Sequence, residues 1–143
     1  MTLMRALTPY ELEVGEAMTA RRDAALRLRD VLDADVAGYE DGMATVLAGR
    51  SREILVPTAA GQIRQVVSDA IGAFEAARHR FRLALVVVAV DNGMNAREIG
   101  DAFGFSRQLA SRYLREARSK WPDLEEHFHE PVGGSGWPGA CAG

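Results

Sequence analysis

The chain has 143 residues, 48% of which are apolar, and its formal net charge at neutral pH is −3. This length and composition are typical of a soluble globular chain with one domain of ordinary size, or a small domain with an appended element. The negative charge excludes a chain that is basic throughout, so binding to a polyanion has to depend on a local excess of basic side chains.

The longest apolar run, Leu83 to Val90, has eight residues and charged neighbours, whereas a membrane span needs about 20 apolar residues. We therefore expect a buried helix segment there and no membrane partner. The N-terminus lacks a long apolar region followed by a cleavage site, which predicts a cytoplasmic protein. Cys141 is the only cysteine, so an intrachain disulfide is excluded.

The first predicted element is a long amphipathic helix. Thr8 can cap it, Pro9 suits the first helical position, and Glu11 completes a capping box. Apolar residues then recur every three, four or seven positions, which predicts a helix to about Ala37. These residues are Val14, Met18, Ala25, Leu28, Leu32, Val36 and Tyr39.

Glycine and proline punctuate the next part of the chain. We expect Gly38 and Gly42 to bracket a break, after which Met43 begins a shorter helix toward Gly49. Pro57 ends the short piece before it, because proline pushes the preceding residue out of the helical region.

A further long helix is predicted from about Ala59 to Val90, and the Asp-Asn-Gly sequence at 91–93 ends it. Its apolar side consists of Ile63, Val66, Val67, Ala70, Ile71, Phe74, Ala77, Phe81, Leu85 and Val88. No stretch alternates convincingly between apolar and polar residues, so the predicted fold class is all-α.

Residues 95 to 118 contain two short helical patterns that meet across a Gly-Phe-Ser turn. Asn95 is a typical N-cap, and Glu98 three places later suggests a capping box. Ile99, Ala102 and Phe103 share one face, and Gly100 leaves room for a second helix to approach. Gly104 ends the first helix, since glycine enters the left-handed conformation without steric cost.

Ser106 is the next N-cap, and Phe105 fills the turn before it. The second helix should run to about Arg118. Its inward residues are Leu109, Ala110, Tyr113, Leu114 and Ala117, and its outward residues are Arg107, Gln108, Ser111, Arg112 and Arg115.

This stretch resembles the helix-turn-helix DNA-binding domains of bacterial and phage regulators. The shared features are Gly100, Gly104, Phe105, the run Ser106-Arg107-Gln108 and the run Ser111-Arg112-Tyr113-Leu114. Ala110 departs from the pattern, because many members carry a larger aliphatic residue there. The resemblance implies that the second helix enters the major groove of double-stranded DNA with its N-terminal half at the base edges.

Three outward residues are the candidate base readers: Arg107, Gln108 and Arg112. Arginine can donate two bonds to guanine, and glutamine can pair with adenine in the same bidentate way. Each good pair contributes roughly 1–3 kcal/mol of discrimination.

Five residues are candidates for contacts to the DNA backbone. Hydroxyl groups at a helix N-terminus suit phosphate or water-mediated contacts, and basic groups further along the helix hold the backbone without reading bases. The residues are Ser106, Ser111, Arg115, Arg118 and Lys120.

Basic charge gathers on this second helix although the whole chain is acidic. Residues 95–120 hold six basic and three acidic side chains. Between Phe105 and Lys120 there are five basic residues and one acidic residue, Glu116. A local field of this size is modest, and a dimer would double it.

A two-helix unit cannot bury its own inner face, so we expect Phe81 to Val90 to supply a third, supporting helix. The long N-terminal helix either folds back on the later long helix or pairs with a second chain. These alternatives are compatible, because a homodimer is the usual way to place two recognition helices one DNA turn apart. The predicted organisation is an N-terminal helical region at 1–57, the DNA-binding domain at 58–122, and a tail at 123–143.

The predicted tail is first acidic and then rich in glycine and proline, which indicates flexibility. His127 and His129, with neighbouring glutamates, form the one cluster with metal-ligand chemistry, but residues two apart point to different sides of a helix. No motif for nucleophilic, phosphate-binding or metal-dependent catalysis occurs. We therefore expect no metal, no cofactor and no enzymatic activity.

Two classes of function remain. The first is a sequence-specific transcriptional regulator that binds double-stranded DNA, as a homodimer, through the helix at about 106–118. The second is an assembly or interaction protein whose helix-turn-helix contacts protein, or binds DNA without sequence preference in packaging, partition or recombination.

Overall fold

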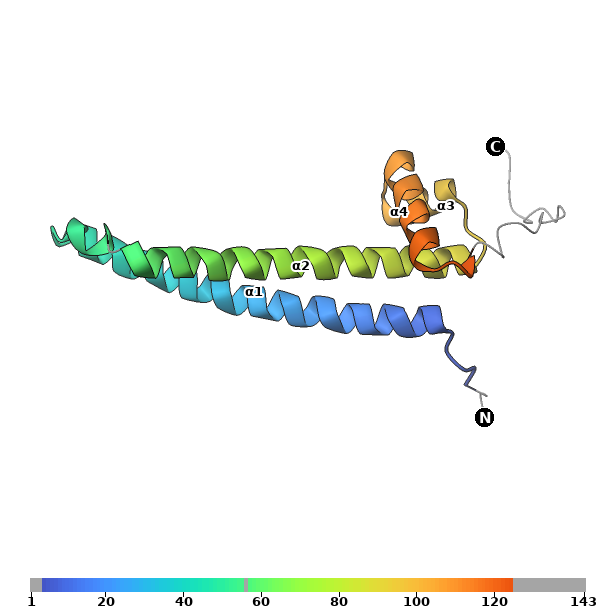
Figure 1. Ribbon diagram of the computed structural model, residues 1–143, viewed down its shortest axis with the longest axis horizontal. Coiled ribbons are helices and arrows are strands. Elements are labelled where there is room, and N and C mark those ends of the chain that lie inside the picture. Colours follow the sequence, from blue (N-terminus) through green and yellow to red (C-terminus); the bar gives the residue numbers. More distant parts are fainter. Residues whose placement is uncertain (1–3, 56, 125–143) are drawn as a thin grey trace, which may run out of the picture. The chain divides into compact units, whose positions relative to one another are not determined.

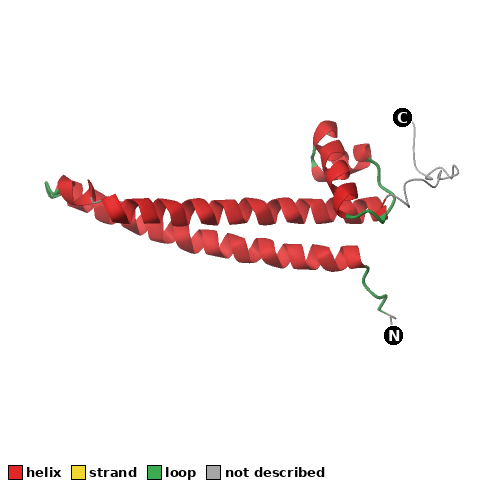
Figure 2. Ribbon diagram, in the orientation of Figure 1, coloured by secondary structure: helices red, strands yellow, loops and turns green. Residues whose placement is uncertain are grey.

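A computed structural model describes residues 4–55 and 57–124. In these ranges every regular element is helical, which confirms the all-α class (Figure 2). The elements are α1 (Pro9–Leu47), the 3-10 helix η1 (Ser51–Leu55), α2 (Pro57–Asp91), α3 (Ala96–Phe103) and α4 (Arg107–Lys120). None of these helices is both long and apolar enough to cross a membrane.

The chain forms two compact units, Met1–Leu85 and Val86–Gly143. The division falls inside α2, so most of this helix belongs to the first unit and its last residues belong to the second. The two units are described separately below.

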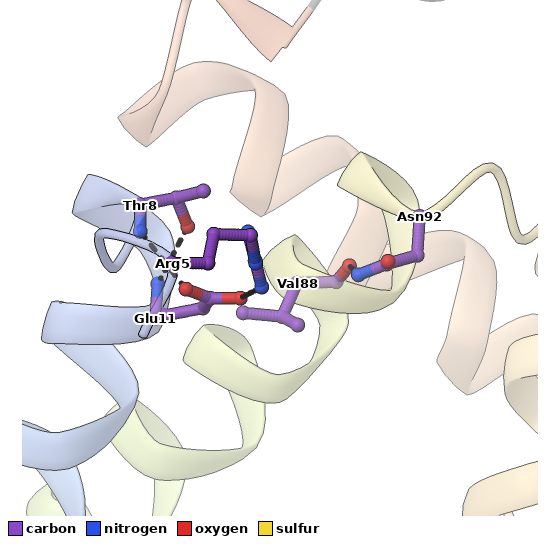
Figure 3. Close-up of polar contacts among 5 residues, drawn as sticks. All are labelled: Arg5, Thr8, Glu11, Val88 and Asn92. Carbon is purple, nitrogen blue, oxygen red and sulfur yellow. Dashed lines mark hydrogen bonds and ion pairs between the residues drawn. The ribbon is translucent and has the colours of Figure 1, made fainter. Parts of the chain in front are cut away.

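A capping box starts α1, as the sequence predicts. The backbone N–H of Thr8 donates to the Glu11 carboxylate at 2.9 Å, and the N–H of Glu11 donates to Thr8 Oγ1 at 3.1 Å (Figure 3). Arg5 also pairs with this carboxylate. Together the backbone hydrogen bond from Thr8 and the side-chain bond from Arg5 lower the pKa of Glu11, because both favour its charged form.

The expected break at Gly38 and Gly42 is wrong, because α1 continues through both to Leu47. Neither glycine has a positive φ angle. A helical glycine costs only about 1 kcal/mol relative to alanine, which the hydrogen bonds and contacts of a 39-residue helix easily offset. The helix ends instead before Gly49, whose φ of 77° is left-handed, and the Arg50 N–H closes this end on the Thr45 carbonyl at 3.0 Å.

In the first unit α2 returns antiparallel to α1, and the two helices form a hairpin (Figure 1). Arg80 on α2 donates to both carboxylate oxygens of Glu13 on α1, at 2.8 and 3.0 Å, which raises the pKa of Arg80. The guanidinium carbon of Arg21 lies 5.2 Å from the ring centre of Phe81. The long N-terminal helix therefore folds back on the later helix, which was one of the two alternatives.

The two units differ in how much apolar surface they bury. In the described part of the hairpin the buried hydrophobic residues are few and mostly small: Ala17, Ala70, Leu83 and Ala84. The described part of the second unit buries more than twice as many over a shorter stretch: Val86, Val87, Ala89, Val90, Ile99, Ala110, Tyr113, Leu114, Ala117 and Leu124. The second unit thus has the denser core, and it contains the residues of functional interest.

Candidate nucleic-acid interface

The helix α3 begins as the sequence predicts, with Asn95 as its N-cap. The side-chain oxygen of Asn95 accepts from the Glu98 N–H at 2.9 Å. The second half of the expected capping box differs, because the Glu98 carboxylate accepts from the side-chain amide of Asn95 at 3.1 Å. The two side chains therefore hold each other at the start of the helix, and one of the exposed amides is satisfied.

A glycine pair shapes the turn between α3 and α4. Gly104 ends α3 with φ 70° and ψ 26°, the left-handed conformation expected for it. The Phe105 N–H then donates back to the Gly100 carbonyl at 2.9 Å. A Cβ on Gly100 would lie 2.9 Å from the Phe105 carbonyl oxygen and 3.8 Å from Ala110 Cβ. Gly100 therefore makes room mainly for the backbone of the turn, and only secondarily for α4.

The inner face of α4 is the one predicted. Ser106 caps the helix by accepting from the Leu109 N–H at 3.1 Å. Ala110, Tyr113, Leu114 and Ala117 are buried and Leu109 is half-buried. Ala110 has no exposed surface, so the small side chain at this position leaves no opening to solvent.

Three aromatic rings brace the turn. The ring centre of Phe105 lies 5.9 Å from that of Phe103 on α3 and 5.3 Å from that of Tyr113 on α4. Tilted rings at these distances attract one another in addition to burying apolar surface. Phe105 thus links both helices to the turn, as expected of a residue that fills it.

Most of the predicted DNA-contacting residues lie on the solvent side of α4. Ser106, Arg107, Gln108, Arg112, Arg115 and Lys120 are exposed. Ser111 and Arg118 are half-buried, and the Arg118 Nε atom is shielded from solvent. Arg118 is therefore less available for a phosphate than the sequence suggests.

Gln108, Arg112, Arg115 and Ser119 recur at i, i+4, i+7 and i+11, so they share one face of α4. All four are exposed, and this face lies opposite buried Ala110, Tyr113 and Ala117. We call this set the α4 ridge. It presents an amide, two guanidinium groups and a hydroxyl in a row, which are the groups that donate to base edges and phosphates.

Two exposed residues of α3 and α4 were missed as candidates in the sequence. Ser119 extends the α4 ridge by one turn beyond Arg115, a position that the i+4 spacing alone would have indicated. Arg97 is exposed in the first turn of α3, where the sequence pattern distinguishes it only by its charge.

The basic groups at the end of α4 also have a structural effect. Arg118 and Lys120 lie in its last turn, where positive charge is stabilising beside the unpaired carbonyls. Both residues therefore favour the helix whether or not DNA is present. The candidate nucleic-acid interface is therefore defined by the α4 ridge and not by the basic residues at the end of the helix.

The remaining core of this unit comes from both of its ends. Val86, Val87, Ala89 and Val90 at the end of α2 are buried, and α2 stops at Asp91 before Gly93, whose φ is 83°. Leu124 is also completely buried, although the sequence assigns it to the tail. Leu124, two residues after Pro122, therefore belongs to the core and not to the predicted tail.

The predicted acidic and glycine-rich segment beyond Leu124 lies outside the described residues, as do His127, His129 and Cys141. Within the described ranges no three histidine, cysteine or acidic residues gather as a metal site. No family model, curated protein or solved structure matches the chain.

Proposed function

We propose that the protein is a sequence-specific DNA-binding regulator that acts as a homodimer. In this proposal α3, the turn and α4 form a helix-turn-helix, the end of α2 supports it, and α4 is the recognition helix in the major groove. The observation that carries the proposal is the α4 ridge, a row of exposed donor side chains on a helix whose opposite face is buried.

The local charge supports this assignment. From Arg107 to Lys120 the helix has five basic side chains and one acid, Glu116, although the whole chain has a net charge of −3. Positive charge at one helix favours encounter with DNA through that helix. One such helix gives a weak field, and two copies in a dimer give a second set of phosphate contacts.

Roles within the interface follow from side-chain chemistry and position. Arg107, Gln108 and Arg112 lie in the N-terminal half of α4 and are the proposed base readers. Arg115 holds a phosphate further along. Ser106 accepts from the Leu109 N–H, and its hydroxyl hydrogen stays available to donate to a phosphate oxygen.

The test compares binding to selected and to random DNA. Fragments of the source genome are enriched on the full-length protein, and affinities are measured by fluorescence anisotropy over a range of salt concentrations. Gln108→Ala or Arg112→Ala should weaken the selected site by about 5- to 150-fold, which is the effect of losing roughly 1–3 kcal/mol per base contact. Random DNA should be affected much less.

Two variants serve as controls. Arg115→Ala should weaken all DNA about equally and lower the salt slope by about 1. Arg52→Ala removes an exposed arginine of η1 and should change neither value. Equal losses on every sequence for all the α4 variants would refute specific readout and favour binding without sequence preference. Absence of binding at any salt concentration would favour a protein-contacting role.

A further inference from the structure

The hairpin leaves much apolar surface uncovered. Sixteen large hydrophobic residues are exposed in the described part of the chain, and all of them lie between Met4 and Ile71. Soluble monomers rarely expose contiguous apolar patches larger than a few hundred Å². The first unit therefore has the surface of a protein that works with a partner.

Part of this surface is a continuous stripe on α1. Met18, Ala25, Leu32, Val36, Tyr39 and Met43 are spaced by three, four or seven residues, so they share one side of the helix. The five large members are exposed by 41% at Leu32 to 68% at Tyr39. We call this set the α1 stripe. It lies beside the face that carries buried Ala17 and half-buried Leu28.

The charges of α1 are divided between its two halves. Residues 21–29 contain four arginines and one aspartate, whereas residues 30–41 contain five acids and no base. Along one flank of the α1 stripe the sequence places Arg22 and Arg29 in the basic half, and Asp33 and Glu40 in the acidic half. Both pairs are spaced by seven residues, so each half repeats its charge on the same side of the helix.

These flanking charges are weakly used within the hairpin. Among the described residues, Arg22 and Arg29 pair only with their sequence neighbours Asp23 and Asp30, at 3.1 and 3.8 Å, with all four side chains more than half exposed. Such surface pairs contribute little to stability. The two arginines are therefore available for acids on another chain.

We infer that a second copy of the chain docks on the α1 stripe, with its own α1 antiparallel to the first and a two-fold axis near Val31. One register brings both patterns close together. It sets Met18 opposite Met43 of the second copy and Ala25 opposite Val36. Arg22 and Arg29 then lie within one residue of the levels of Glu40 and Asp33, a rise of about 1.5 Å that these long side chains can span, and two-fold symmetry repeats every pair.

The length of the α1 stripe suits such a dimer. With Val46 and Leu47, the large residues of the α1 stripe are each at least 41% exposed and extend along about eight turns of α1, which gives a second helix a long apolar face to cover. A parallel pairing would instead place like charges together along the whole helix, because each half carries mainly one sign. The antiparallel arrangement is the one that the charges favour.

A groove beside the α1 stripe also favours a macromolecular partner. It has a volume of about 1660 Å³ and is bordered by Tyr39, Met43 and Val46 of α1, Ile54 of η1, and Ile63 and Val66 of α2. Small-molecule sites usually enclose about 300–1,000 Å³. The groove is larger, and Tyr39 and Met43 belong to both surfaces, so a second copy on the α1 stripe covers part of its rim.

This inference rests on the proposed function only in that it specifies the homodimer named there. Its test measures mass by sedimentation velocity over a concentration series of the full-length protein, without DNA. Loss of DNA binding would therefore leave the result intact, and a monomer would leave the DNA measurements intact.

The decisive variants reverse charges on one half of α1 at a time. Arg22→Glu with Arg29→Glu makes the flank of the α1 stripe acidic throughout, and Asp33→Arg with Glu40→Arg makes it basic throughout. Each double variant alone should dimerise about tenfold or more weakly than the wild type. A mixture of the two should form a heterodimer, since every cross-chain pair is then opposite in sign.

The matched control is Asp69→Arg with Glu75→Arg, which makes the same charge change at two exposed positions of α2. It should dimerise as the wild type does, and circular dichroism should show unchanged helicity in every variant. A wild-type chain that stays monomeric would overturn the inference. So would dimers insensitive to the α1 reversals, or a mixture that fails to form the heterodimer.

Discussion

Replacement of Gly100 by alanine tests whether the turn between α3 and α4 is as tightly built as its geometry indicates. The added Cβ would lie 2.9 Å from the carbonyl oxygen of Phe105, closer than such atoms approach in real structures. The obstacle is backbone, and the same residue's N–H is bonded to the Gly100 carbonyl at 2.9 Å. Relief of the clash therefore requires the turn itself to move.

The expected magnitude follows from two opposing effects. Alanine in place of a helical glycine stabilises by about 0.5–1 kcal/mol when space allows. Overpacking in a close-packed site destabilises by about 1–3 kcal/mol. We expect Gly100→Ala to lower the free energy of unfolding of the second unit by about 1–2 kcal/mol. Gly72→Ala in α2 is the control for a glycine with free space, because a Cβ there meets nothing within 4 Å. It lies in the first unit, whose unfolding is followed by circular dichroism, and it should stabilise that unit by about 0.5–1 kcal/mol.

Urea unfolding followed by the fluorescence of Trp121 reports on the second unit, since Trp121 directly follows α4 and is half-buried. The comparison is made in a Trp137→Phe background so that one tryptophan gives the signal. An unchanged or higher midpoint for Gly100→Ala would refute the argument, because the turn would then have accommodated the methyl group freely.

Three further predictions concern single interactions. Ser106→Ala should destabilise the second unit by about 1 kcal/mol in the same urea assay, since the Leu109 N–H loses its partner; an unchanged midpoint would show that water replaces the cap. The lowered pKa of Glu11 means that its carboxylate supports the start of α1 above the ordinary value of 4.5, and that this support is lost as the pH falls through the lower folded pKa. Amide shifts of Thr8 measured by NMR should follow this titration and should lose it in Glu11→Gln. A double-mutant cycle on Glu13 and Arg80, each replaced by alanine, should give a coupling of about 0.5–1 kcal/mol in thermal unfolding, and zero coupling would show that the two-bond contact is not formed in solution.

The helix caps and the left-handed helix end of this fold can be predicted from short stretches of sequence. The sequence predicts helix starts at Thr8 with Glu11, at Asn95 and at Ser106, and the structure contains a helix start at each. It also predicts the left-handed end of α3 at Gly104. Each of these depends on a few neighbouring residues, on the geometry of unpaired backbone amides, and on the steric freedom of glycine, so no distant contact is needed to predict it.

The prediction of a helix break at Gly38 and Gly42 was wrong because it, too, relied on local residue preferences alone. A glycine is a helix end only where the chain adopts a positive φ, and α1 retains helical geometry at both positions. Whether a weak local preference prevails depends on the stability of the helix around it, which a short window of sequence does not reveal.

The sequence by itself determined the helical class, the caps, the turn at Gly104 and the inward and outward faces of α4, because these depend on spacing along one helix. Only the tertiary structure decided that the Phe105 carbonyl is what requires glycine at 100, that Arg118 is half-buried, that Leu124 belongs to a core, and that α1 keeps an exposed apolar stripe after folding against α2. These outcomes depend on which surfaces meet across long separations in the chain. Hydrophobic burial is non-directional, so a pattern of apolar residues shows that a face needs cover without showing what covers it.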